Sequence, residues 1–212
     1  MTSALPAPAP GGAGVAPVAT LSTAALRANA PLAVGATGLD ALAADAWGHG
    51  AEWVTSVLAG LGMDATALDP IALYGLPGAR TRPVMSLRGR ALGTKPLLRG
   101  EGVSYGYTHR APRDTTVALV TGGYAQGVVR SLGNKATVSI DGHRHRIVGR
   151  VAMDVSVVDV GDAAIARGAE VVFFGDPARG HPSLQEWTDA TGLTAAEIVA
   201  AVGAHAERSV TE

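Results

Sequence analysis

The sequence predicts a mainly β protein, an antiparallel β-barrel or sandwich with short helices before and after it. Five runs rich in β-branched residues carry this prediction, at 115–121, 136–140, 143–148, 155–160 and 170–174. Short strands separated by turns are typical of such folds. Asp141-Gly142 lies between two of the runs, and this pair tolerates the positive φ angles of a two-residue hairpin turn.

Short helices are expected on both sides of the strands. Near the C-terminus, Ser183 is followed three residues later by Glu186, and Thr194 by Glu197. Each pair has the form of a capping box, which satisfies unpaired amide groups at a helix start. Before the strands, residues 48–62 place apolar side chains at three- and four-residue spacing between glycines. This spacing predicts one more helix.

Length and charge distribution divide the chain into three parts. A chain of 212 residues fits one main domain and an appendage. Arg27 is its only lysine or arginine before Arg80. Residues 1–18 are rich in Ala, Pro and Gly, a composition that cannot bury enough surface to fold. We therefore expect a flexible tail at 1–18, an N-terminal segment at 19–66 and a β-domain at 67–212.

Composition excludes several classes of partner and site. The net charge of -1 offers no global field for nucleic acid or for an anionic membrane. Absence of cysteine excludes disulfides, a thiol nucleophile and a thiolate metal site, and suits the cytoplasmic location that we expect. No secretory signal or run of transmembrane length is expected.

Four ordered blocks resemble the C-terminal β-domain of alanine racemases. They are PVMSL at 83–87, GEGVSYG at 100–106, GYAQG at 123–127 and VGRVAMD at 148–154. Residues 71–75 are similar to the segment that ends the cofactor-binding barrel of that family. The resemblance covers about residues 70–200 and implies a β-domain of the alanine racemase C-terminal type.

Alanine racemases hold pyridoxal phosphate on a barrel lysine, and the chain departs from the family at that position. Residues 43–50 are similar to the family's lysine motif, with a first helix expected around 21–29, but the lysine position is Ala43. Alanine cannot form the Schiff base that makes the cofactor an electron sink. The family's cofactor contacts are also altered at 68–70 and 205–210. We expect no bound cofactor and interpret residues 19–66 as a truncated remnant of the barrel.

The resemblance implies roles for four residues of the β-domain. Tyr105 matches the catalytic tyrosine, which exchanges the substrate α-proton on the face opposite the lysine. Tyr124, Met153 and Asp154 match residues near the substrate entrance. Racemisation requires a base on each face, and only this one remains. In the family, the tyrosine reaches the partner's barrel across a dimer interface. Gln126 replaces the usual aspartate of the entrance.

Plainer interpretations stand beside these roles. Tyr105, Tyr124 and Met153 could serve only in packing, and Asp154 could cap a turn. The histidines of the 143–145 run would share one strand face, but no third metal ligand stands at suitable spacing, so we expect no metal site.

Residues 80–113 hold eight basic residues and one acid, Glu101. A basic face on a small barrel could track single-stranded nucleic acid, but aromatic residues are sparse in this stretch. We therefore interpret the charge as a solvated face or a protein-binding patch and expect no nucleic-acid partner.

Four functional hypotheses follow. The first is a racemase-like pseudoenzyme that is inactive alone and acts with, or on, a full-length alanine racemase, or self-associates. The second is a β-domain kept as a protein- or ligand-binding module, and the third is a decaying gene product. Autonomous alanine racemase activity is the fourth and is disfavoured, because the cofactor lysine is missing.

Overall fold

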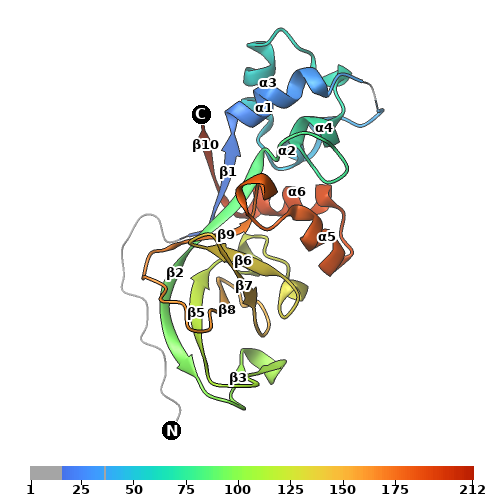
Figure 1. The fold of residues 1–212 in the computed structure, drawn as a ribbon. Coiled ribbons are helices and arrows are strands. Elements are labelled where there is room, and N and C mark those ends of the chain that lie inside the picture. Colours follow the sequence, from blue (N-terminus) through green and yellow to red (C-terminus); the bar gives the residue numbers. More distant parts are fainter. Residues whose placement is uncertain (1–15, 36) are drawn as a thin grey trace.

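Six strands close into a barrel in the computed structural model, which describes residues 16–35 and 37–212 (Figure 1). In ring order they are β2 (Met85–Leu97), β5 (Thr115–Thr121), β8 (Val155–Asp159), β7 (His143–Ile147), β6 (Thr137–Ile140) and β9 (Glu170–Phe174). Every neighbouring pair is antiparallel, and β9 pairs with β2 to close the ring. The predicted antiparallel β-fold is confirmed, and it is a barrel.

Strand β2 makes closure possible because it pairs with different neighbours along its length. Its first half pairs with β9 and its second half with β5. The register shifts at two places, between Leu87 and Arg88 and between Ala91 and Gly93. Irregularities of this kind bend a strand and increase its twist. The long strand can therefore curve around the barrel, as Figure 1 shows.

The predicted hairpin turn is confirmed between β6 and β7. Asp141 and Gly142 have φ angles of 50° and 79°, and Ile140 faces His143 in the register. The structure places all five predicted strand runs in the barrel, with small differences at their ends.

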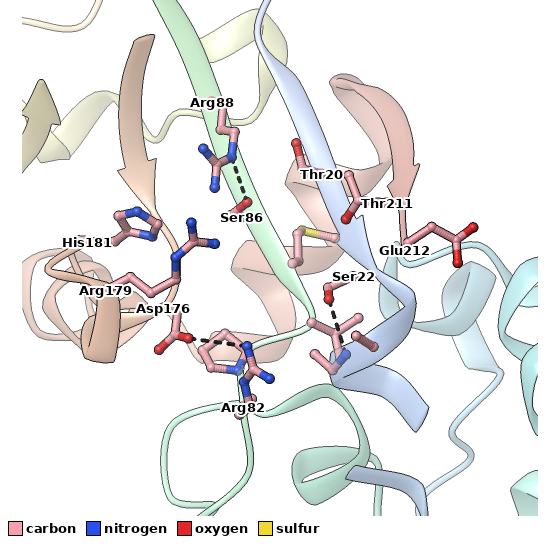
Figure 2. A pocket seen from close by; sticks show the side chains of 15 residues that line it. Thr20, Ser22, Arg82, Ser86, Arg88, Asp176, Arg179, His181, Thr211 and Glu212 are labelled. Atoms are coloured by element: carbon pink, nitrogen blue, oxygen red, sulfur yellow. Dashed lines mark hydrogen bonds and ion pairs between the residues drawn. The ribbon is translucent and has the colours of Figure 1, made fainter. Parts of the chain in front are cut away.

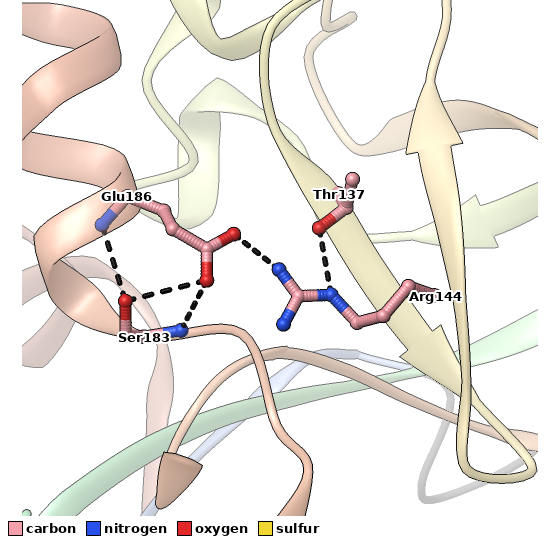
Figure 3. A network of polar contacts seen from close by, with 4 residues as sticks. All are labelled: Thr137, Arg144, Ser183 and Glu186. Carbon is pink, nitrogen blue, oxygen red and sulfur yellow. Dashed lines mark hydrogen bonds and ion pairs between the residues drawn. The ribbon is translucent and has the colours of Figure 1, made fainter.

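Both predicted C-terminal helices are present as α5 (Leu184–Thr191) and α6 (Ala195–His205). Both capping boxes form: Ser183 and Glu186 begin α5, and Thr194 and Glu197 begin α6. Figure 3 shows that Glu186 also faces Arg144 of β7, with which it forms an ion pair. The first of these helices is thus attached to the barrel through its own cap.

The N-terminal segment packs on the C-terminal helix α6 and on β10 (Glu207–Thr211). It contains α1 (Thr23–Asn29), α2 (Ala43–Trp47) and α3 (Ala51–Ala59), with single turns η1 (Ala30–Leu32) and η2 (Ala65–Ala67). The helix expected over 48–62 is thus shorter than expected. A further short helix, α4 (Pro70–Tyr74), leads into β2.

Two of the strands that sequence analysis missed, β1 (Val18–Ser22) and β10, pair with each other. Barrel strand β2 was also not among the five predicted runs. Strand β1 pairs antiparallel with β2 and parallel with β10. Both lie outside the ring and extend the sheet from β2. Most of the predicted tail, residues 1–15, lies outside the described residues.

One apolar core runs through the barrel, the C-terminal helices and the N-terminal segment. Leu26 and Leu58 belong to the same buried cluster as Phe173 and Trp187. A second, smaller cluster lies at the far end of the barrel and contains Leu97, Val103, Ala111, Val117 and Val148. The N-terminal segment is therefore packed on the β-domain. None of the described helices is long and apolar enough to cross a membrane.

Candidate functional site

Tyr105 lies at the tip of a projecting loop. Strands β3 (Gly102–Val103) and β4 (His109–Arg110) pair with each other, and the single turn η3 (Tyr105–Tyr107) connects them. Tyr105 is 90% exposed and Tyr107 is 62% exposed. Val103 at the base of the loop is buried in the smaller core cluster. A packed base therefore carries an aromatic ring into solvent.

The backbone of this loop is strained. Ser104 and Tyr107 have φ angles of 59° and 44°, which residues other than glycine rarely adopt. Strain of this kind persists only where surrounding structure enforces it, and it concentrates at functional sites. Here Asn134 links two segments beside the loop. Its Oδ1 accepts from the amide of Gly149 at 2.7 Å, and its Nδ2 donates to Thr108 Oγ1 at 3.2 Å.

The other three predicted site residues lie on two loops that hydrogen-bond to each other. Tyr124 begins the single turn η4 (Tyr124–Gln126), and its amide donates to the carbonyl of Ala152 at 3.0 Å. Gly123 must be glycine, because a Cβ there would lie 2.1 Å from the carbonyl oxygen of Met153. Met153 is 54% exposed and Asp154 is exposed.

Gln126 joins these two loops. Its Oε1 accepts from the amide of Gly123 at 3.0 Å, and its Nε2 donates to Asp154 Oδ1 at 2.9 Å. An aspartate or glutamate could not donate to Asp154 when ionised and would place a second negative charge beside it. The departure from the family at this position therefore has a structural role in this chain.

Sequence analysis missed a basic cleft that is lined by Thr108, next to the Tyr105 loop, and by Arg130, which contacts Tyr124. Arg130, Lys135 and Arg150 line it together with polar residues, and no acidic residue lines it. The Arg130 guanidinium lies 4.4 Å from the centre of the Tyr124 ring, a cation–π geometry. Arg150 belongs to the recognised block 148–154, but neither spacing nor composition indicated that it would meet Arg130.

The segment similar to the lysine motif forms a turn of left-handed helix. Ala44, Asp45, Ala46 and Trp47 all have φ angles between 48° and 56°. Asp45 steadies the turn, because it accepts from the amide of Ala51 at 2.8 Å and pairs with Arg208 of β10 at 2.5 Å. These two contacts lower the pKa of Asp45, the backbone hydrogen bond more than the arginine.

Aromatic packing fills the space behind this turn. The buried His49 ring stacks on Tyr74, with the ring centres 4.2 Å apart. The Tyr74 hydroxyl donates to the carbonyl oxygen of Ala41, and burial raises the pKa of this tyrosine. The residues that follow Ala43 are thus held by packing and main-chain hydrogen bonds.

The residues present here do not fit a covalently held pyridoxal phosphate. Ala43 offers no amine, and the chain's two lysines, Lys95 and Lys135, lie on or beside the barrel. Asp69, in the altered block 68–70, caps α4 by accepting from the amide of Ile71 at 2.9 Å. Val210, in the altered block 205–210, is an apolar side chain on β10 that is half exposed.

The remaining sequence candidates do not gather into a site. His143 and His145 lie on β7, and the described residues contain no group of three or more His, Cys, Asp or Glu that could hold a metal ion. The basic residues of 80–113 are spread from the segment after α4, along β2, to the segment after β4. Arg88 pairs with Glu170 at 2.5 Å, and Arg110 lies 5.4 Å from the centre of the Tyr107 ring.

Comparison with known proteins relates this geometry to one family. Residues 84–210 match the family model described as "Alanine racemase, C-terminal domain". The chain is 44% identical over 141 residues to an alanine racemase of Frankia casuarinae, covering 66% of this chain and 35% of that protein. It is 39% identical over 150 residues to an alanine racemase of Thermobifida fusca, covering 71% and 40%.

Solved structures give the same relationship. An alanine racemase from Streptomyces coelicolor superposes with a TM-score of 0.63 and 31% identity, covering 80% of this chain and 51% of that chain. A Bartonella henselae alanine racemase, solved with covalently bound pyridoxal phosphate, superposes with a TM-score of 0.61 and 28% identity over 69% and 43%. The chain thus spans well under two thirds of the length of these relatives.

Proposed function

This chain belongs to the alanine racemase C-terminal domain family, and from that premise we propose that it is a racemase-like pseudoenzyme that acts with, or on, a full-length alanine racemase. Alone it does not interconvert D- and L-alanine. The observation that carries this proposal is the pairing of an intact, exposed Tyr105 loop with Ala43 at the lysine position.

The chemistry of racemisation supports the first half of the proposal. A proton must leave one face of the α-carbon and return on the other, so the reaction needs two bases on opposite sides. Tyr105 can serve one face. Ala43 cannot serve the other, and it cannot hold the cofactor. We therefore expect neither bound pyridoxal phosphate nor activity from the isolated chain.

The shape of the β-domain supports the second half. An aromatic side chain held 90% exposed by a strained, anchored loop loses contact with water favourably when it enters a pocket. The resemblance implies that this pocket is the barrel of a partner subunit. Arg130, Lys135 and Arg150 beside the loop would then face the partner and favour an acidic rim.

Mixing experiments test docking directly. The purified chain is added to a full-length alanine racemase of the same cell, and complexes are measured by size-exclusion chromatography with light scattering. We expect a mixed complex that Tyr105→Ala weakens at least about tenfold, because the anchoring ring is lost. Leu61→Ala is the matched control, since Leu61 is 41% exposed on the N-terminal segment, away from the tip. Absence of a complex contradicts the proposal.

The racemisation rate of the mixture shows whether the chain contributes its tyrosine to the racemase or only blocks the racemase barrel. If the chain supplies Tyr105, the wild type preserves the racemase rate and Tyr105→Phe lowers the rate of mixed sites about a hundredfold, because the ring docks without its hydroxyl. If the chain only occupies the barrel, both proteins lower the rate equally.

Absorbance tests the cofactor half of the proposal. The purified chain is incubated with pyridoxal phosphate and then treated with borohydride. We expect no stoichiometric internal-aldimine band and no cofactor trapped on one lysine, since Lys95 and Lys135 are the chain's only lysines and neither matches the family's lysine position. Specific trapping on either lysine, or racemisation by the isolated chain, would refute the proposal.

Self-association is a second candidate mode of action. Leu32 and Val34 of the N-terminal segment are 70% and 67% exposed, and apolar groups of this kind favour contact with another protein surface. Sedimentation of the chain alone tests this proposal, with a dimer as the expected species. A cytoplasmic location stays a prediction, checked by fractionation.

A further inference from the structure

A polar cleft lies on the side of the molecule where β1, β2 and β10 meet. Its volume is about 220 Å³, and the segment from Asp176 to His181 forms its opposite wall. This segment follows β9 and contains the single turn η6 (Pro177–Arg179). The cleft shares no lining residue with the Tyr105 and Tyr124 loops.

Two arginines and a histidine meet at one end of this cleft. Figure 2 shows Arg88 from β2 on one side and Arg179 and His181 from the opposite wall on the other. The Arg88 side chain is partly occupied: Nη1 pairs with Glu170 at 2.5 Å and Nε donates to Ser86 at 3.2 Å. Arg179 has no carboxylate partner among the described residues. Its guanidinium therefore keeps all five donors for a ligand.

His181 adds a neutral donor between these cations. Its Nδ1 is buried against Gly175, where an added Cβ would lie 2.8 Å away, and has no hydrogen-bond partner among the described residues. The ring nitrogen left for a ligand is therefore Nε2. Burial lowers the pKa of His181, and the charges of Arg88 and Arg179 lower it further, against the opposite effects of Asp176 and Glu170. A neutral imidazole with its proton on Nε2 can donate that N–H to an acceptor in the cleft.

The acidic residues that line the cleft leave this end open. Asp176 caps η6 by accepting from the amide of Ala178 at 2.9 Å, and it lies 3.9 Å from Arg82. Glu212 lies across the cleft from His181, beyond β1 (Figure 2). Glu170 pairs with Arg88, so Arg179 is the guanidinium at this end that has no carboxylate partner among the described residues.

We propose that this cleft binds a small oxyanion, a phosphate or a carboxylate, between the side chains of Arg88, Arg179 and His181. Guanidinium groups present parallel N–H donors that match the oxygens of both anions. A cleft of about 220 Å³ is smaller than the usual pocket for a drug-sized ligand, which selects a compact anion. The proposal is independent of docking on a racemase.

Nuclear magnetic resonance of the ¹⁵N-labelled full chain tests this site. Inorganic phosphate and acetate are titrated separately, with chloride as the third arm at matched ionic strength. We expect saturable shifts of the His181 ring and the Arg179 side-chain Nε–H with phosphate, acetate or both. Saturation by phosphate alone assigns the site to phosphate, and saturation by acetate alone assigns it to carboxylates.

Matched variants distinguish binding at a specific site from nonspecific attraction of the anion to positive charge. Arg179→Gln should weaken binding at least about fivefold, because it removes the uncommitted guanidinium. It should not disturb folding, since that side chain holds no partner among the described residues. Arg99→Gln, at an exposed arginine in the turn between β2 and β3, should leave binding unchanged. Equal weakening by both variants, shifts of the same size with chloride, or no saturable shift would overturn the proposal.

Discussion

At the scale of single residues, His49 shows how a motif can keep its packing after losing its chemistry. The imidazole is fully buried, and its Nδ1 lies 3.0 Å from the carbonyl oxygen of Ala46. Its Nε2 is buried without a hydrogen-bond partner among the described residues. Burial lowers the pKa of His49 from 6.5 to about 4. The folded protein therefore holds a neutral histidine at neutral pH.

This buried histidine predicts a loss of stability in mild acid. The unfolded chain takes up the proton near pH 6.5, while the folded chain does so only near pH 4. The contribution of neutral His49 to the free energy of unfolding should thus be fully present above pH 6.5. It should decrease as the pH falls toward 4, by about 3 kcal/mol in total. Urea unfolding between pH 4 and 8 measures the loss.

Variants that cannot titrate isolate the contribution of His49. His49→Phe keeps a ring against Tyr74, and His49→Gln keeps a polar group in less space. Both should show a flatter stability profile between pH 4 and 6.5 than the wild type, whatever their stability at pH 8. The acids and the other histidines are the same in all three proteins, so identical profiles would show that His49 does not cause the loss.

At the scale of elements, the start of α5 combines two interactions that differ in strength. Ser183 Oγ accepts from the amide of Glu186 at 3.3 Å, and Glu186 Oε1 accepts from the amide of Ser183 at 3.0 Å. Glu186 also pairs with Arg144, which donates to Thr137 at 2.9 Å (Figure 3). The cap satisfies partly buried main-chain donors, whereas the ion pair is solvent-accessible.

The cap should therefore contribute more than the ion pair. Ser183→Ala is expected to lower the free energy of unfolding by about 1 kcal/mol, and Ser183→Asp should leave it nearly unchanged, because Asp also caps helices. Glu186→Gln should cost less than Ser183→Ala, since Gln still accepts from Ser183. Thermal unfolding followed by circular dichroism measures all three. A larger cost for Glu186→Gln would show that the ion pair holds the helix.

At the scale of the whole molecule, the shared apolar core makes the N-terminal segment part of one folding unit. Gly48 packs so closely on α6 that a Cβ there would lie 2.6 Å from the carbonyl oxygen of Val199. Arg208 connects β10 to the same turn through its ion pair with Asp45. A continuous core of this kind favours cooperative unfolding.

Tryptophan fluorescence can test this cooperativity. Trp187→Phe leaves Trp47 and Trp53, which report on the N-terminal segment. The double variant Trp47→Phe, Trp53→Phe leaves Trp187, which packs against Phe174 with ring centres 5.0 Å apart. Within each variant, the fluorescence midpoint should coincide with the circular dichroism midpoint. Earlier loss of the Trp47 and Trp53 signal would show a loosely attached segment.

The sequence by itself determined the features that depend on neighbouring residues. The five barrel runs, the Asp141-Gly142 turn and the two capping boxes each follow from side-chain and backbone chemistry within a few positions. The four family blocks and the alanine at position 43 could also be recognised there. The family roles of Tyr105, Tyr124, Met153 and Asp154 stay predictions.

Only the tertiary structure decided what depends on distant partners. The parallel pairing of β1 with β10 joins Val18 to Glu207, and two bulges in β2 let the ring close. The same holds for the meeting of Arg130 with Arg150 and of Arg88 with Arg179. No local pattern encodes such pairings, because their free energy comes from the packing and shape of the whole chain.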